Sequence, residues 1–104
     1  MRELLLNLAE YDRSLTAELG ASHPKVQELR EANARELELV VDEDGWPTIA
    51  EAGEEGSAAA LLVACHATSR PAFQRRCLTM MKASARQGEV PAEHVAELEA
   101  AIRD

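Results

Sequence analysis

The sequence predicts an all-α fold, a compact bundle of four to five main helices that forms a single domain over residues 1–104. Three observations predict this class. Apolar residues recur at spacings of three and four along several segments, which is the period of one helical face. The chain has one Tyr, one Trp and one Phe, so its core depends on aliphatic residues, a composition that favours helices. No segment shows the strict alternation of a strand, and a chain of this length supports one core.

The first two helices are predicted before residue 45. The first covers residues 2–19 and ends at Gly20. The second covers residues 24–42, with Ser22 as its expected N-cap and Pro24 in the first turn, where no amide donor is needed. Asn33 falls on the apolar face of this second helix. The apolar positions are Leu4, Leu8, Tyr11, Leu15 and Leu19 in the first helix and Val26, Leu29, Leu37 and Val40 in the second.

A turn is predicted at Gly45-Trp46-Pro47-Thr48, called the GWPT turn below. Proline drives the residue before it towards extended geometry, so a helix does not continue through Pro47. Thr48 has the capping-box spacing to Glu51, and we expect it to cap a short helical turn that Gly53 closes.

Three further helices complete the predicted bundle. The helix over residues 54–66 is small or apolar at most positions, so it can bury most of its circumference and is expected near the centre. The next helix begins at Pro71, stops at Gly88 and forms a hairpin with the central one. The last begins at Pro91 and continues to the C-terminus. The inward positions are Phe73, Cys77, Met80, Met81 and Ala85 in the fourth helix and Val95, Leu98 and Ile102 in the last.

The net charge of -8 argues against two classes of partner. Nucleic acids and anionic membrane surfaces select for clustered Lys and Arg, so neither is expected to bind. No apolar run approaches the roughly 20 residues that span a bilayer, and the N-terminus lacks a secretory cleavage signal. The sequence therefore predicts a cytoplasmic protein.

The two cysteines predict neither a disulfide nor a metal site. Cys65 and Cys77 do not form a CxxC motif, and buried free thiols are the expectation in a reducing compartment. Cys65 and its neighbour His66 point about 100° apart on a helix, and a fourth ligand is missing. We predict no metal and no cofactor.

Charge is distributed unevenly along the chain. Residues 36–55 are rich in acids, whereas a later segment carries only basic charges, namely Arg70, Arg75, Arg76, Lys82 and Arg86. We expect these opposite charges to pair within the molecule. The alternative is an acidic partner that docks on Arg70, Arg75 and Arg76.

Several segments together resemble a known family. They are the GWPT turn, Gly53-Glu54, the Ala-rich helix that ends in His66-Ala67, and the Phe73-Gln74-Arg75-Arg76-Cys77-Leu78 stretch. This arrangement over residues 33–98 resembles the bacterial domain-of-unknown-function family six-six-two-four. In that family a GWPT-type turn precedes a Gln-His-Ala step, a Phe-Gln step, a Gly-Glu-Val-like loop, an Asp-Arg pair and a Tyr-Gly-Thr tail.

The chain departs from that family pattern at three places. Cys65 stands where the family has Gln, Ala100 and Ala101 stand where the Asp-Arg pair is expected, and the chain stops at Asp104 before any Tyr-Gly-Thr segment. The family has no assigned activity. If its polar residues form an active site, the resemblance implies that this chain has lost part of it.

Four residues are candidates for a ligand site: Asn33, Trp46, His66 and Gln74. His66 could act as a general base or be satisfied by Gln74 or a backbone carbonyl. Asn33 is expected to bond the backbone of the GWPT turn, because a buried amide without partners costs about 1–3 kcal/mol. Trp46 could cover a ligand or plug the core with its indole donor bonded to a carbonyl. Asp12 could join the network of His66 or that of Asn33, but it is expected to be solvated.

The sequence favours a non-catalytic module that binds a protein or peptide partner. One alternative is a degenerate small enzyme or ligand-binding domain with a pocket of His66, Gln74 and Asn33. A further alternative is a carrier or precursor protein that another enzyme modifies at its C-terminal end, Ala101-Ile102-Arg103-Asp104. The sequence indicates neither a substrate nor an oligomeric state.

Overall fold

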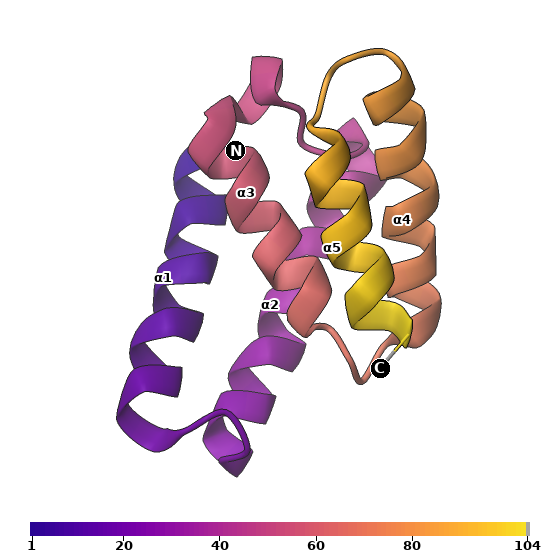
Figure 1. Ribbon diagram of the computed structural model, residues 1–104. Coiled ribbons are helices and arrows are strands. Elements are labelled where there is room, and N and C mark those ends of the chain that lie inside the picture. The colour runs from indigo at the N-terminus through magenta and orange to yellow at the C-terminus, as the bar shows by residue number, and fades with distance from the viewer. Residues whose placement is uncertain (104) are drawn as a thin grey trace.

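The computed structural model describes residues 1–103, which form five helices (Figure 1). The described residues contain no strand, so the predicted all-α class is confirmed. None of the described helices is long and apolar enough to cross a lipid bilayer. The helices are α1 (Arg2–Leu19), α2 (Pro24–Asp44), α3 (Ile49–His66), α4 (Pro71–Arg86) and α5 (Ala92–Arg103).

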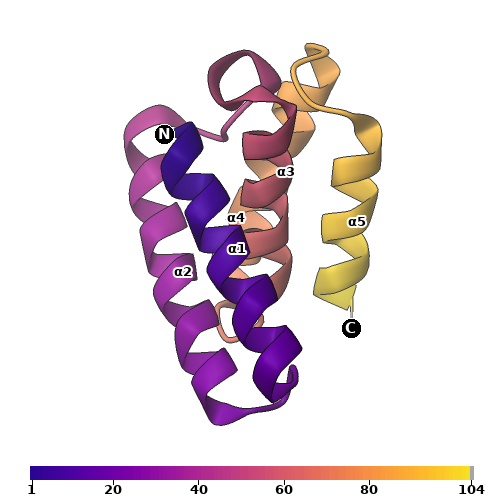
Figure 2. The same cartoon turned by 90° about the vertical axis from the view of Figure 1, so that its left-hand side faces the viewer.

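Successive helices run in opposite directions, so α1, α3 and α5 point one way and α2 and α4 the other (Figure 1). Helix α3 lies in the middle and contacts all four others. In Figure 2, α1 lies in front, α2 at the left, α4 behind and α5 to the right of α3. The sequence predicts a hairpin of α3 and α4, but α4 packs more on α5 than on α3.

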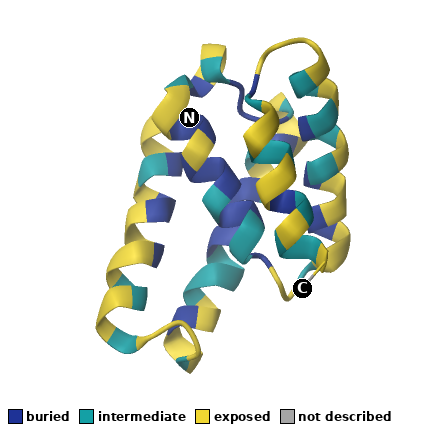
Figure 3. Cartoon of the chain, viewed as in Figure 1, coloured by how far each residue is buried: buried dark blue, intermediate teal, exposed yellow. Residues whose placement is uncertain are grey.

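Burial is concentrated on α3 (Figure 3). Small side chains let neighbouring helices approach it on several sides, as the sequence predicted. A Cβ at Gly56 would be in contact with α1, 3.4 Å from Arg2 Cγ, and would lie only 2.9 Å from Ala52 Cβ of the same helix. The buried residues of α3 are Ala52, Gly56, Ser57, Ala59, Ala60, Leu61, Val63 and Ala64.

The GWPT turn is anchored at both ends. Gly45 has φ 77° and donates its N–H to the carbonyl of Val41, ending α2. The Thr48 hydroxyl then accepts the N–H of Glu51 at 3.3 Å, which confirms its predicted role as the cap. Gly53, at φ 75°, closes the first turn of α3 as predicted, and the helix continues beyond this break.

Two further hydrogen bonds tie the turn and the start of α3 to the rest of the bundle. The Ser57 hydroxyl donates to the carbonyl of Pro47 at 2.9 Å, and the Ile49 N–H donates to the carbonyl of Glu89 at 3.1 Å. Trp46 is buried, as expected of a plug. The predicted hydrogen bond from its indole to a carbonyl is wrong, since Trp46 Nε1 meets no acceptor among residues 1–103.

Two details of the first helices differ from the prediction. His23, not Ser22, is the N-cap of α2, and its Nδ1 accepts the N–H of Lys25 at 3.0 Å. The reason is that Pro24 occupies the first helical position, so the residue before it becomes the cap. The predicted apolar face of α1 is also rotated from the buried one, because Tyr11 is 58% exposed. The buried residues of α1 are Leu5, Leu8, Ala9 and Asp12.

Candidate functional site

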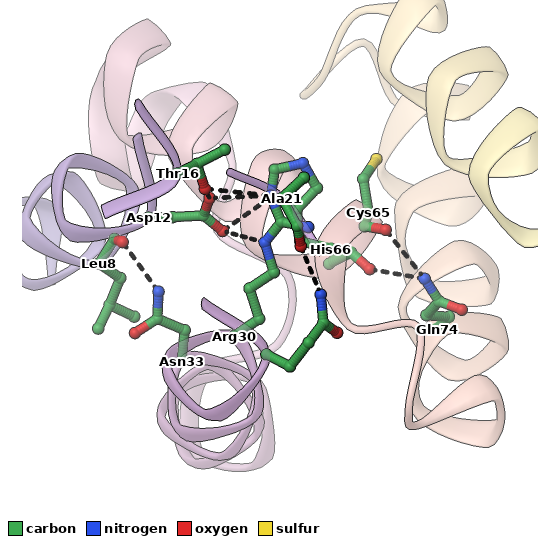
Figure 4. A network of polar contacts seen from close by, with 11 residues as sticks. Leu8, Asp12, Thr16, Ala21, Arg30, Asn33, Cys65, His66 and Gln74 are labelled. Atoms are coloured by element: carbon green, nitrogen blue, oxygen red, sulfur yellow. Dashed lines mark hydrogen bonds and ion pairs between the residues drawn. The ribbon is translucent and has the colours of Figure 1, made fainter. Parts of the chain in front are cut away.

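The two buried amides predicted as ligand contacts are both bonded to helix backbones. Asn33 Nδ2 donates to the carbonyl of Leu8 at 2.9 Å, so its predicted bond to the GWPT turn is wrong (Figure 4). It faces α1 at that level of α2, where a helical carbonyl has a second lone pair to offer. Gln74 Nε2 donates to the carbonyls of Ala64 and Cys65 at 3.0 and 3.2 Å. Gln74 therefore satisfies the end of α3, whose last carbonyls lack helical donors.

His66 pairs with Asp12 instead of Gln74. Its Nδ1 lies 2.7 Å from Asp12 Oδ2, across the contact between α3 and α1 (Figure 4). The expected His66–Gln74 bond is wrong because Gln74 turns towards the backbone of α3. The expectation that Asp12 is solvated is wrong as well, since Asp12 is only 1% exposed.

Asp12 is the centre of a polar network that joins three helices. Arg30 of α2 donates from Nε to Asp12 Oδ2 at 3.2 Å and from Nη2 to Oδ1 at 3.3 Å. Thr16, one turn along α1, donates its hydroxyl to Asp12 Oδ1 at 3.1 Å. The buried carboxylate thus has its charge matched by Arg30 and its lone pairs filled, as a buried charge requires.

This environment favours the charged form of Asp12. Burial alone raises the pKa of a carboxyl, but the hydrogen bond and charge of His66, followed by the charge and hydrogen bonds of Arg30, outweigh it. The pKa of Asp12 is therefore lowered from its ordinary 3.8. A carboxylate facing Nδ1 makes that nitrogen the protonated one, so Nε2 is the ring atom of His66 left for another partner.

The lowered pKa of Asp12 predicts a loss of stability in acid. A carboxyl whose pKa is lower in the folded state stabilises the fold fully above its unfolded value, about pH 4, and loses that contribution as pH falls through the folded value. We expect the difference in free energy of unfolding between the native protein and Asp12→Asn to shrink as pH falls from about 5 to about 2. Urea denaturation across this range measures it. A difference that stays constant would contradict the assignment.

A hollow of about 360 Å³ lies beside His66, between α1, α3 and α5. Asn33, Trp46 and Gln74 do not line it, so the predicted pocket shared by His66, Gln74 and Asn33 is not formed. Its lining residues are Arg13 from α1, Ala58, Leu61, Leu62, Cys65 and His66 from α3, and His94 and Glu97 from α5.

The thiols offer no nucleophile to this hollow. Burial, with a smaller effect of Glu97, raises the pKa of Cys65 to about 11, and burial raises that of Cys77 to about 12. Both thiols stay protonated near neutral pH, whereas the thiolate is the reactive form. Within residues 1–103, no three His, Cys, Asp or Glu side chains are grouped so that they could hold a metal ion.

A second hollow, of about 380 Å³, lies where the start of α1 meets the end of α2. We call it the α1–α2 groove. Apolar and acidic side chains share its lining, and Leu39 is 61% exposed there. The apolar members are Met1, Leu4, Leu39 and Val40, and the acidic members are Glu36, Glu43 and Asp44.

The arginines predicted to meet an acidic partner are mostly engaged within the chain. Arg70 Nη2 lies 2.7 Å from Glu38 Oε1, and its guanidinium carbon lies 5.6 Å from the centroid of the Phe73 ring. Arg76 pairs with Asp42. Only Arg75 of the three is exposed without an ion pair among the described residues. The predicted pairing of charges within the molecule therefore joins α4 to α2.

Comparison with known proteins assigns this chain to no family. No protein-family model matches it, and no match was found among curated proteins or solved structures. The resemblance carried by the GWPT turn and His66-Ala67 stays a prediction.

Proposed function

We propose that this chain is a non-catalytic helical module that binds a protein partner through the α1–α2 groove. The observation that supports this proposal is a group of exposed apolar side chains bordered by acidic ones. Leu39 is among the most exposed large apolar side chains, and Met1 and Leu4 beside it are exposed as well. Grouped apolar side chains with a polar rim are typical of protein-binding surfaces.

The charge of the groove indicates the chemistry of the partner. Glu36, Glu43 and Asp44 form its acidic side, and the whole chain carries a net charge of -8. Complementarity then favours a segment with apolar side chains next to Lys or Arg, and the long-range field speeds its approach. An amphipathic helix with leucines on one face and lysines beside them fits these requirements.

Other features of the chain fit this proposal better than its alternatives. An acidic partner at Arg70, Arg75 and Arg76 would compete with the acids of α2 for two of the three arginines. An enzyme that uses Asn33, His66 and Gln74 together has no shared pocket to work in. The proposed site of modification at the C-terminal end includes Asp104, which lies outside the described residues.

We also propose that the protein is bacterial and acts in the cytoplasm. The bacterial origin rests on the family resemblance of the GWPT turn and of the helix that ends in His66. The cytoplasmic location is supported by the two free cysteines, Cys65 and Cys77, since a reducing compartment keeps thiols free.

The groove is tested with a defined probe, an amphipathic helical peptide of leucine and lysine. We expect it to bind the native protein more tightly at low salt than at high salt, because the acidic rim contributes to attraction. Glu43→Lys and Leu39→Ser should each weaken binding by roughly tenfold, which corresponds to about 1.4 kcal/mol. Isothermal titration calorimetry measures the affinities.

Two matched variants control for charge and apolarity elsewhere on the surface. Glu18→Lys makes the same charge change on an exposed part of α1 away from the groove, and Tyr11→Ser removes an exposed apolar side chain outside it. Both should bind the peptide like the native protein. Equal weakening by Glu18→Lys and Glu43→Lys, or equal binding of a leucine and glutamate peptide, would refute the groove as a specific site.

A further inference from the structure

The hollow beside His66 has an apolar side and a polar end. Ala58, Leu61 and Leu62 of α3 form the apolar side. His66 of α3 and Arg13 of α1 are polar residues of the lining. At about 360 Å³ the hollow is at the small end of the roughly 300–1,000 Å³ range of ligand pockets. Its size and lining suit a small molecule with an apolar body and one polar head.

His66 is held in one orientation for such a head. Asp12 accepts a hydrogen bond from the Nδ1–H of His66, and Asp12 itself is held by Arg30 and Thr16. The side chain of His66 is nevertheless 30% exposed, and its Nε2 has no hydrogen-bond partner among the described residues. A ring fixed by a buried carboxylate presents its other nitrogen without the entropic cost of ordering a free side chain.

The charges around the hollow leave Arg13 available to a carboxyl group. Arg30 already matches the charge of Asp12, whereas Arg13 has no ion-pair partner among the described residues. Glu97 of α5 is the one opposing charge on the lining, and the neighbouring thiol of Cys65 is neutral.

The α5 wall holds a further polar atom. The Nδ1 of His94 is buried and meets no partner among residues 1–103, although His94 lines the hollow. This atom has almost no surface open to the hollow, so the proposed site does not use it.

We propose that this hollow binds a small carboxylate that carries a short alkyl chain. The carboxyl group lies beside His66 and Arg13, where its hydroxyl donates a hydrogen bond to His66 Nε2 and its other oxygen accepts from Arg13, and the chain lies along Ala58, Leu61 and Leu62. This site is separate from the α1–α2 groove and shares none of its lining residues. The small-molecule site goes beyond the proposed binding of a protein partner.

Hexanoate is the probe for this site, observed by NMR of the full chain. We expect saturable shifts of the His66 imidazole and of the Ala58 and Leu61 methyl groups. Arg13→Ala should weaken binding by roughly tenfold, the size expected for one charge-assisted hydrogen bond. Arg13 is exposed, so this variant keeps the fold.

Three comparisons decide the outcome. His66→Gln should lose hexanoate binding while His23→Gln, which changes a histidine outside the hollow, keeps it. Hexanol, with the chain but no charge, and inorganic phosphate, with charge but no chain, should both bind more weakly than hexanoate. Equal binding of hexanol, equal binding of phosphate, or no shift of His66 with any probe would each overturn the proposal. Leu39→Ser should leave hexanoate binding unchanged, which separates this result from that of the α1–α2 groove.

Discussion

Asp12→Ala is expected to lower the free energy of unfolding by about 3–5 kcal/mol. Asp12 is 1% exposed and is the only acid among the described residues that pairs with Arg30, whose side chain is itself only 14% exposed. Its removal leaves a nearly buried guanidinium without a countercharge and His66 Nδ1 without its acceptor. Because Arg30, His66 and Asp12 belong to three different helices, the loss weakens α1, α2 and α3 together. Urea denaturation followed by circular dichroism measures it.

Two variants separate the charge of Asp12 from its volume. Asp12→Asn keeps the size and one acceptor oxygen but loses the charge, so it should be destabilised by less than Asp12→Ala. Asp42→Ala removes an exposed acid that pairs with Arg76, and it should cost about 0–1 kcal/mol, as surface ion pairs do. A cost for Asp12→Ala no larger than that of Asp42→Ala would show that the network does not hold the helices together.

Trp46→Ala should lower the free energy of unfolding by about 3–5 kcal/mol, the usual cost of truncating a large core aromatic. Trp46 is 3% exposed and lies in a turn fixed by the Ser57 bond to Pro47, so its surroundings cannot easily close over a cavity. Trp46→Phe should cost far less, about 1 kcal/mol, because it leaves a smaller void. The indole N–H donates to no group among the described residues, so the phenyl ring forfeits no hydrogen bond.

Thermal or urea denaturation of both variants tests the plug role of Trp46. Leu39→Ala serves as the control, since this exposed side chain should contribute little to stability. If Trp46→Phe were as unstable as Trp46→Ala, the indole N–H would have a stabilising partner and the plug would be a polar anchor.

The helix boundaries could be predicted because local chemistry decides them. Pro24 and Pro71 open helices, Gly20 and Gly45 end them, and Thr48 caps one through a bond to a residue three positions away. Each of these signals acts within a few residues. They are therefore visible in the sequence without any knowledge of the tertiary structure.

The buried face of α1 could not be predicted, because two stripes compete on that helix. The stripe through Leu4 and Tyr11 is the more apolar, but the stripe through Leu5 and Asp12 is buried. Asp12 can be buried because it pairs with Arg30 and His66, which lie 18 and 54 positions further along the chain. The spacing of apolar residues gives no information about such distant partners.

The sequence predicts the candidate site only in part, because contacts between distant residues leave no signal in the local pattern. His66 was singled out by its place at the end of an apolar helix, and it does line a hollow. Asn33 was placed on the core face correctly, yet its partner was not, since an amide can bond any nearby carbonyl. Arg13 and His94 were missed because exposed or half-buried residues on amphipathic helices show no local signal of a shared cavity.

The close contact between positions 52 and 56 within α3 also constrains how this sequence can change. A methyl group at position 56 would fall 2.9 Å from Ala52 Cβ, one helical turn away, so the two positions together have room for a single methyl. Ala at position 56 therefore becomes tolerable when position 52 turns to Gly. In chains that share this fold, the two positions should covary as a pair with a fixed total volume, and neither should accept a branched side chain.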